Sequence, residues 1–123
     1  MAYYIDACIW IDFIEGRTDD FLIKCIQEEH SVIISNFLLN EIFRYELPMS
    51  IRMIISILES KGLLRKINAS NVQDQEAARI SKNRNVPFGD ALHAVLARDN
   101  DAIVVTRDKH FLMLRDICNI ELL

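Results

Sequence analysis

Short apolar runs alternate with segments of helical periodicity along the whole chain. The runs Val32–Ile34 and Ile103–Val105 are continuously apolar and β-branched, which is typical of strands buried on both faces. The segment Met49–Ser60 instead carries isoleucine or leucine at positions 51, 54, 55 and 58, the spacing of one face of a helix. The pattern therefore predicts a chain that alternates between strand and helix.

Turn residues, helix caps and periodicity divide the chain into about five strands and six helices. The predicted strands are Tyr3–Asp6, Val32–Ser35, Leu63–Ile67, Ala102–Thr106 and Cys118–Leu122. The predicted helices are Cys8–Glu15, Asp19–His30, Phe37–Tyr45, Met49–Ser60, a polar helix from 71 to about 84, and Asp90–Asp99, with a loop at 85–89 and a turn or short helix at Lys109–Leu114. This order predicts an α/β fold: an open, mainly parallel sheet of about five strands with helices on both faces.

Length and composition are those of one globular domain spanning residues 1–123. Hydrophobic residues make up 51% of the chain, which excludes intrinsic disorder as the main state. The net charge of −4 argues against a broad basic face for duplex DNA, although it leaves nucleic acid open as a substrate.

Cysteine usage and hydropathy indicate a reducing compartment. The chain has three cysteines, Cys8, Cys25 and Cys118, at wide spacings without a CxxC pair, so neither a disulfide scaffold nor a zinc knuckle is expected. No apolar run approaches the roughly 18 residues of a membrane span. We therefore expect a cytoplasmic protein that does not cross a membrane.

Four acidic residues stand where ligands bind in such sheets, beyond the carboxyl ends of the strands. Asp6 closes the first predicted strand and Asp108 follows the fourth. Asp90 begins the helix that leads into the fourth strand. Glu41 lies in the helix after the second strand, among apolar neighbours, where a carboxylate is unusual unless it is paired or ligated.

Clustered carboxylates raise each other's pKa, and a bound divalent cation reverses this cost. Hard oxygen ligands favour Mg²⁺ or Mn²⁺, and the lack of a Cys/His constellation disfavours zinc. Such a site activates water and stabilises the charge of a phosphodiester during hydrolysis. The four acids thus predict a metal-dependent phosphodiesterase site.

The sequence around these acids resembles the PIN domain family, and among its members the VapC-like toxins of toxin–antitoxin pairs. The resemblance rests on four motifs that follow in the family's order over nearly the whole chain. They are Tyr4-Ile5-Asp6-Ala7-Cys8-Ile9-Trp10, Leu38-Leu39-Asn40-Glu41-Ile42, Asp90-Ala91-Leu92-His93-Ala94 and Val104-Val105-Thr106-Arg107-Asp108.

The resemblance implies a Mg²⁺- or Mn²⁺-dependent endoribonuclease. It assigns metal binding and catalysis to Asp6 and Asp90 first, with Glu41 and Asp108 completing the acidic pocket. It also implies a cognate antitoxin and a homodimer. One position departs from the family, which often carries a hydroxyl or amide residue where this chain has Cys8; a thiol is a poorer partner for Asp6.

Other residues and other functions remain open at this level. Thr106 and Arg107 are candidate RNA contacts, Thr106 being equally suited to hydrogen-bond a carboxylate. His93 is expected to be a half-buried structural residue rather than a proton carrier. A PIN-like scaffold without catalysis is the main alternative. An aspartyl-phosphate phosphatase with Asp6 as nucleophile is weaker, because Cys8 stands where that chemistry wants a second aspartate.

Overall fold

Five parallel strands form one sheet in the computed structural model, which describes residues 2–17, 21–43 and 49–123, without the side chains of residues 43 and 50. The strands are β1 (Ala2–Ile5), β2 (Ser31–Ser35), β3 (Leu64–Ile67), β4 (Ala102–Thr106) and β5 (Ile120–Leu122). Their order across the sheet is β3-β2-β1-β4-β5, and every neighbouring pair is parallel. The predicted α/β class and parallel sheet are confirmed.

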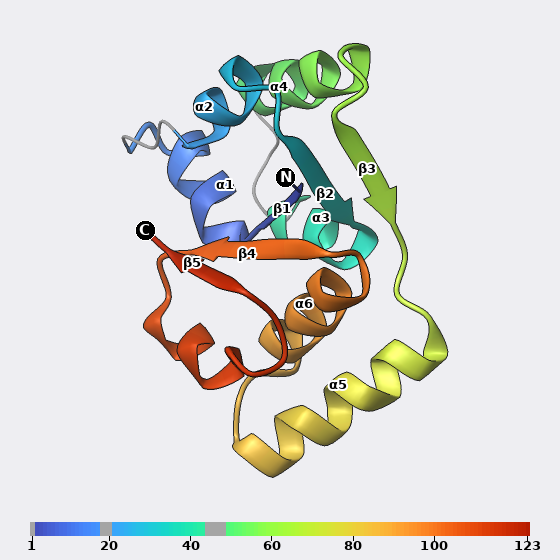
Figure 1. Ribbon diagram of the computed structural model, residues 1–123. Helices are drawn as coiled ribbons and strands as arrows, with labels where there is room; N and C mark the ends of the chain where they lie inside the picture. Colours follow the sequence, from blue (N-terminus) through green and yellow to red (C-terminus); the bar gives the residue numbers. More distant parts are fainter. Residues whose placement is uncertain (1, 18–20, 44–48) are drawn as a thin grey trace.

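Helices cover both faces of this sheet. They are α1 (Ala7–Ile14), α2 (Phe21–Gln27), α3 (Asn36–Phe43), α4 (Met49–Ser60), α5 (Asn71–Arg84), α6 (Phe88–Asp99) and the 3-10 helix η1 (Lys109–Leu114). In Figure 1, α1, α2 and α4 lie on one side of the strands, and α5 and α6 lie on the other. The long polar helix α5 packs mainly against α6.

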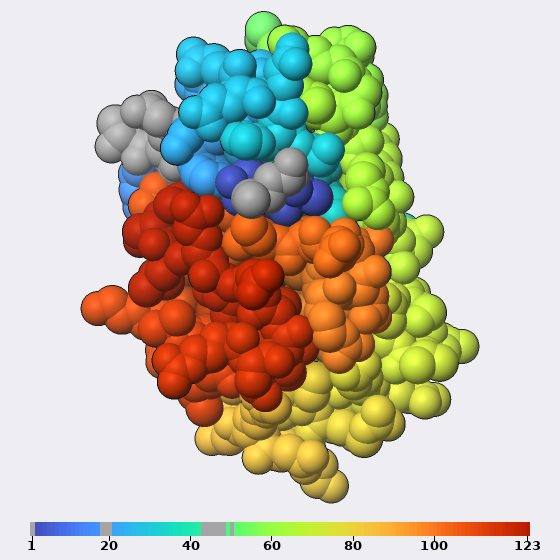
Figure 2. Space-filling view, in the orientation of Figure 1, coloured from blue at the N-terminus to red at the C-terminus, as the bar shows by residue number. Residues whose placement is uncertain are grey.

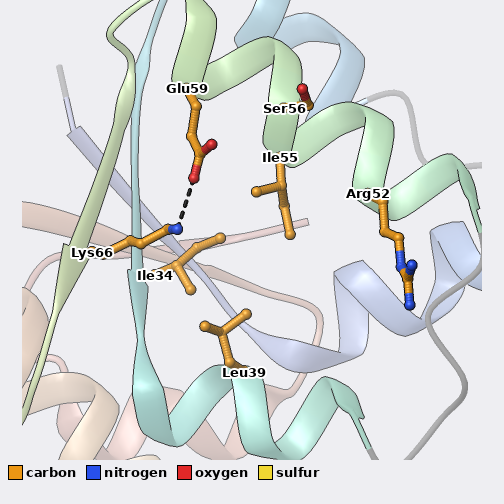
Figure 3. Close-up of a pocket in the computed structure, with 7 residues that line it drawn as sticks. All are labelled: Ile34, Leu39, Arg52, Ile55, Ser56, Glu59 and Lys66. Atoms are coloured by element: carbon orange, nitrogen blue, oxygen red, sulfur yellow. Dashed lines mark ion pairs between the residues drawn. The ribbon is translucent and has the colours of Figure 1, made fainter.

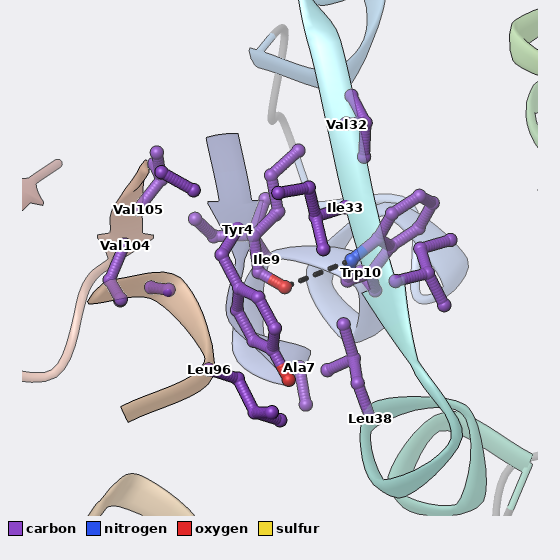
Figure 4. Packing of buried hydrophobic residues seen from close by; sticks show 14 of the residues in the cluster. Tyr4, Ala7, Ile9, Trp10, Val32, Ile33, Leu38, Leu96, Val104 and Val105 are labelled. Atoms are coloured by element: carbon purple, nitrogen blue, oxygen red, sulfur yellow. Dashed lines mark hydrogen bonds between the residues drawn. The ribbon is translucent and has the colours of Figure 1, made fainter. Parts of the chain in front are cut away.

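The core is built from the residue types that the pattern predicts to be buried. Tyr4, Ile33 and Val104 come from the three central strands, and all are fully buried. Trp10 of α1 packs among them, and its indole N–H donates to the carbonyl of Ile5 at 3.2 Å (Figure 4). Burying such aromatic and branched side chains on both faces of a parallel sheet is the main favourable term in folding.

Several boundaries differ from those predicted, each for a local reason. Asp6 is not the last strand residue, because its carboxylate accepts from Ala7 N–H and caps α1. Helix α6 begins at Phe88 rather than at Asp90, because Pro87 fixes the backbone that starts it. Asp90 therefore lies inside the first turn and is not a cap.

Other elements keep their predicted type with shorter bounds. Helix α2 ends at Gln27, because Glu29 adopts a positive φ of 56°. Strand β5 is limited to Ile120–Leu122. The predicted beginning of α2 at 19–20 and the predicted end of α3 at 44–45 lie outside the described residues.

Gly89 lies in the first turn of α6, at a close approach to α3. A Cβ at this position would come within 3.1 Å of the Phe37 ring, closer than ordinary side-chain contacts. The predicted loop at 85–89 thus contains the start of a helix, and its glycine permits close packing rather than a turn.

The surface seen in Figure 2 places the C-terminal segment, in red, beside α6 and at the edge of the sheet. None of the helices among the described residues combines the length and apolar character needed to span a bilayer.

Candidate active site at the carboxyl end of the sheet

The order of the strands creates a crevice between β1 and β4. The chain leaves β1 toward β2 and β3 on one side, then returns to add β4 and β5 on the other. Helices leave neighbouring strands in opposite directions at such a switch point, so ligands bind there, beyond the carboxyl ends. Asp6 follows β1 and Asp108 follows β4, so the two residues flank this crevice.

Asp6 is held in place by three donors. One carboxylate oxygen accepts from Ala7 N–H at 2.8 Å, and the other accepts from the Thr106 hydroxyl at 2.8 Å and from the Cys8 thiol at 3.1 Å. The residue is only 8% exposed. These bonds fix the carboxylate between the ends of β1 and β4.

Cys8 does support Asp6, although a thiol is a weaker donor than a hydroxyl. Burial, followed by the nearby charge of Asp6, raises the pKa of Cys8 to about 11. The group therefore stays protonated at neutral pH and donates its proton to the carboxylate.

Thr106 is fully buried, and its hydroxyl links two of the acidic residues. It donates to Asp6 and accepts from the backbone N–H of Asp108 at 3.0 Å. Of the two roles considered for Thr106, contact with a carboxylate is observed. A contact between Thr106 and RNA stays a prediction. Arg107 donates to Asp12 at 3.0 Å, and its role in RNA binding stays a prediction.

Asp90 is the residue whose electrostatics stand out. Burial, then the charges of Asp6 and Asp108, raises its pKa to about 6, with a further upward contribution from Glu41. A carboxylate in the first turn of a helix is normally stabilised by the helix dipole. The upward shift shows that burial and like charge outweigh that effect here.

Asp108 caps η1 and faces Asp90 across a small cavity. Its carboxylate accepts from the backbone N–H of His110 at 2.9 Å and lies 2.9 Å from that residue's ring Nδ1. Both acids and His110 line a cavity of about 230 Å³. Asp6, Asp90 and Asp108 thus lie at one crevice, and the charges of Asp6 and Asp108 contribute to the raised pKa of Asp90.

Glu41 reaches the site from α3 and is bound by His93. The two side chains meet at 2.5 Å, between Glu41 Oε1 and His93 Nε2. His93 lies one turn after Asp90 on α6 and is 1% exposed. The expectation of a half-buried histidine was wrong, because the ring is buried, and its structural role stays a prediction.

The donor set fits a hard divalent cation without forming a closed cage for it. Within the described part of the chain, no three His, Cys, Asp or Glu side chains converge closely enough to hold a metal ion by themselves. Mg²⁺ commonly binds through one or two carboxylates and otherwise keeps water or takes phosphate oxygens. The carboxylates of Asp6, Asp90 and Asp108 are oxygen donors of this kind, and burial, followed by the charges of Asp6 and Asp108, raises the pKa of Asp90.

A second cavity, of about 410 Å³, lies away from these acids. Figure 3 shows it between β2, β3, α3 and α4, lined by Ile34, Leu39 and Ile55, with the Lys66–Glu59 ion pair of 2.7 Å at one side. Its lining is apolar and its carboxylate is already paired with a lysine. It has none of the chemistry of the crevice.

Two further residues, absent from the predicted site, connect to His93. Tyr4 and Ser35 are buried in β1 and β2, and both join His93 in a hydrogen-bonded chain. Tyr4 lies in an apolar strand, so its position in the sequence predicts only a core residue. Ser35 carried a usable signal, since a serine that ends a strand just before a helix is a frequent N-cap, and its hydroxyl accepts from Leu38 N–H at 3.0 Å.

Comparison with protein families identifies the fold. The family model of the PIN domain matches residues 3–116. The chain belongs to the PIN domain family. Comparison with curated proteins by sequence gave no significant match.

Solved structures of three other proteins share this fold. The chain is similar to one in the crystal structure of VapBC2 from Rickettsia felis bound to a DNA fragment from their promoter, with a TM-score of 0.71, 18% identity, and coverage of 100% of this chain and 99% of that one. PAE2754 from Pyrobaculum aerophilum gives a TM-score of 0.62 at 19% identity, covering 98% and 92%. FitAcB from Neisseria gonorrhoeae gives 0.59 at 14% identity, covering 96% and 95%. At these identities, the likeness is one of fold.

Proposed function

We propose that this PIN-domain protein is an endoribonuclease that uses Mg²⁺ or Mn²⁺ to hydrolyse phosphodiester bonds in single-stranded RNA. The observation that carries the proposal is the group of carboxylates around the crevice between β1 and β4, where burial, followed by the charges of Asp6 and Asp108, raises the pKa of Asp90 to about 6. Uncompensated charge of this kind is costly to the fold and is typical of sites that bind a cation or act on a substrate.

Asp6, Asp90, Glu41 and Asp108 are proposed as the metal-binding and catalytic residues. Asp6 is oriented by Thr106 and Cys8, and Asp90 and Asp108 line the cavity where a phosphate would enter. When bound, the metal would lower the pKa of a water molecule and offset the charge of the phosphate. The exposed ring of His110 stands at the same cavity and can donate to a phosphate oxygen.

The proposal extends to the setting of a toxin–antitoxin pair in the cytoplasm. Its support is the resemblance to VapC-like toxins and the fold shared with a chain of VapBC2. A cognate antitoxin would then be the protein partner. The 123 residues would form one domain, acting as a homodimer, and an exposed apolar row on α4 offers a surface for a protein partner: Met49, Met53 and Ile57 are 72%, 56% and 36% exposed.

Cleavage of single-stranded RNA tests this proposal. The purified protein should cut RNA with Mg²⁺ or Mn²⁺, stop with EDTA, and lose activity in Asp90→Asn. The matched control is Asp101→Asn, at the opposite end of β4, where the backbone has a positive φ of 57° that asparagine tolerates. Cleavage that persists in Asp90→Asn would contradict the proposed site.

A PIN-fold binding module without catalysis is the second candidate. It is favoured by the lack, among the described residues, of three ligands converged on one point. Metal-dependent cleavage lost in Asp90→Asn excludes it. The phosphatase alternative is weakened further, because both carboxylate oxygens of Asp6 already accept hydrogen bonds.

A further inference from the structure

A continuous chain of hydrogen bonds runs from β2 through β1 to α6 and ends on Glu41. The Ser35 hydroxyl and the Tyr4 hydroxyl are 2.6 Å apart, and the Tyr4 hydroxyl is 2.6 Å from His93 Nδ1. The opposite ring nitrogen, Nε2, lies 2.5 Å from Glu41 Oε1. We call these four side chains the Ser35–Glu41 relay.

One arrangement of the protons gives every donor of the relay an acceptor. As a carboxylate, Glu41 can only accept, so His93 Nε2 must carry the proton. In a neutral ring, Nδ1 then accepts from the Tyr4 hydroxyl, and the Tyr4 oxygen accepts from the Ser35 hydroxyl. Ser35 oxygen accepts in turn from Leu38 N–H at 3.0 Å, so the relay is satisfied at its beginning as well.

The doubly protonated ring fits less well. Nδ1–H would donate to Tyr4, and Tyr4 would donate to Ser35. The Ser35 proton would then have no further acceptor among the contacts of the described residues. Ser35 is fully buried, where an unused polar proton is costly.

Burial makes the relay rigid. Tyr4, Ser35 and His93 are each at most 1% exposed, and burial raises the pKa of Tyr4, which keeps its hydroxyl protonated. The Phe37 ring packs edge-on against the His93 ring at 5.4 Å between centroids. The other His–Glu contact in the described chain joins His30 to Glu28 at 2.9 Å and is partly exposed, although the His30 ring also packs edge-on against Tyr3.

We propose that His93 is a positioning residue: the relay fixes it as the neutral Nε2–H tautomer, and this tautomer holds Glu41 in the orientation used by the metal site. The inference rests on the proposed function, because it takes Glu41 as part of that site. The contact with His93 uses Glu41 Oε1, and Glu41 Oε2 has no hydrogen-bond partner among the described residues. Groups that orient a metal ligand through its second hydrogen bond contribute strongly to metal affinity.

The tautomer is tested by nitrogen NMR of the three histidine rings in the full-length, metal-free protein. The ring signal that disappears in His93→Gln belongs to His93. It should show a protonated Nε2 and an unprotonated Nδ1 at neutral pH. In Tyr4→Phe, which removes the donor to Nδ1, the proton should stay on Nε2, because Glu41 can only accept, and the Nδ1 shift should move as its hydrogen bond is lost. An Nδ1–H or doubly protonated ring in the wild type, or an unchanged His93 in Tyr4→Phe, overturns the inference.

The positioning role is tested by Mn²⁺ affinity, measured by calorimetry. His93→Leu should weaken binding roughly 10-fold or more, whereas His93→Gln, whose amide can donate to Glu41, should retain most of it. In a Glu41→Gln background, His93→Leu should add nothing, because the two residues act through one contact. His30→Gln is the matched control and should bind as the wild type does. Should His93→Leu not fold, Tyr4→Phe replaces it and should also weaken binding.

The outcomes separate the two proposals. A wild type that neither binds Mn²⁺ nor cleaves RNA overturns the proposed function and, with it, the role of His93 in metal binding. Normal metal binding and cleavage in folded His93→Leu overturn the inference alone. Rescue by His93→Gln, but not by His93→Leu, supports a hydrogen-bonding role over simple filling of the core.

Discussion

The two ends of helix α6 handle negative charge in opposite ways. At its C-terminal end, Arg98 binds both carboxylate oxygens of Glu76, at 2.5 and 2.8 Å, and contacts Asp99 at 2.9 Å. At its N-terminal end, Asp90 faces other acids, and the structure gives it no lysine or arginine partner among the described residues. One end balances its charges within the chain, and the other does not.

The pKa values of the carboxyl groups differ between the two ends of α6 in the same way. Hydrogen bonds from Arg98 lower the pKa of Glu76. For Asp99, burial acts upward, but hydrogen bonds from Arg98 and Gln73 outweigh it and lower the pKa. Asp90 is shifted up, to about 6. The carboxylates at the C-terminal end are paired with Arg98, whereas Asp90 lies near other acids at the switch point of the sheet.

Divalent metal should distinguish the two ends most strongly. With Mn²⁺ at about one hundred times its dissociation constant, the free energy of unfolding should rise by about 2.7 kcal/mol. The rise should be lost in Asp90→Asn and kept in Asp99→Asn, as measured by thermal melting with and without EDTA. Equal stabilisation of both variants would place the metal elsewhere.

Removing the Thr106 hydroxyl should destabilise the acidic crevice between β1 and β4 without changing a charge. Thr106→Val leaves Asp6 and the backbone N–H of Asp108 each short of one hydrogen bond, so the free energy of unfolding should fall by about 2 kcal/mol. Thr106→Ser keeps the hydroxyl and should lose less. Urea denaturation measures both, and a larger loss in the serine variant would argue against the hydrogen bonds.

The pH dependence of Asp90 should have the sign of a raised carboxyl pKa. Its folded pKa of about 6 lies above the ordinary value of 3.8, so its ionisation destabilises the fold above pH 6. This penalty should decline as the pH falls through 6 and vanish below about 4. Without metal, Asp90→Asn should be more stable than the wild type at pH 7 by about 1 to 2 kcal/mol, allowing for partial solvent screening, and no more stable at pH 4.

Changes at the C-terminal end of α6, where the charges are paired, should have the smallest effect on the free energy of unfolding. The pH dependence of that effect should have the opposite sign. Arg98→Ala should lower the free energy of unfolding at pH 7 by only about 0.5 to 1 kcal/mol, because the ion pairs are partly exposed. Since the pKa values of Glu76 and Asp99 are lowered in the fold, this contribution should disappear as the pH falls through them. High salt should reduce it, and a salt-independent loss would point to packing instead.

Local signals were sufficient for much of the fold. Helix α4, helix α5 and strand β4 have the predicted bounds, because an apolar face, a Ser70 capping box and a continuous β-branched run each determine one element. The start of α6 was missed, since Phe88 and Gly89 resemble a loop in sequence. Pro87, which fixes the backbone just before them, was a local signal for this start, whereas the contact between the Phe88 ring and the Phe37 ring of α3 at 6.1 Å is not visible in sequence.

The candidate site was predictable to the extent that it depends on topology. Parallel strands bring their ends together, so Asp6 and Asp108 could be placed side by side from their position after β1 and β4. The support of Glu41 could not be foreseen, because it depends on which face of each strand Tyr4 and Ser35 occupy and on how closely α3 approaches α6. Those are properties of packing between residues distant in sequence.

The missing side chain of Gly89 has a consequence for the distance between two helices. Any Cβ there would press on the Phe37 ring, and that ring in turn packs against His93. Glycine is a poor helix former and costs about 1 kcal/mol relative to alanine. Its missing Cβ allows α6 to approach α3 closely. A single methyl group added at position 89 would therefore push α6 away from α3 and lengthen the distance between His93 and Glu41.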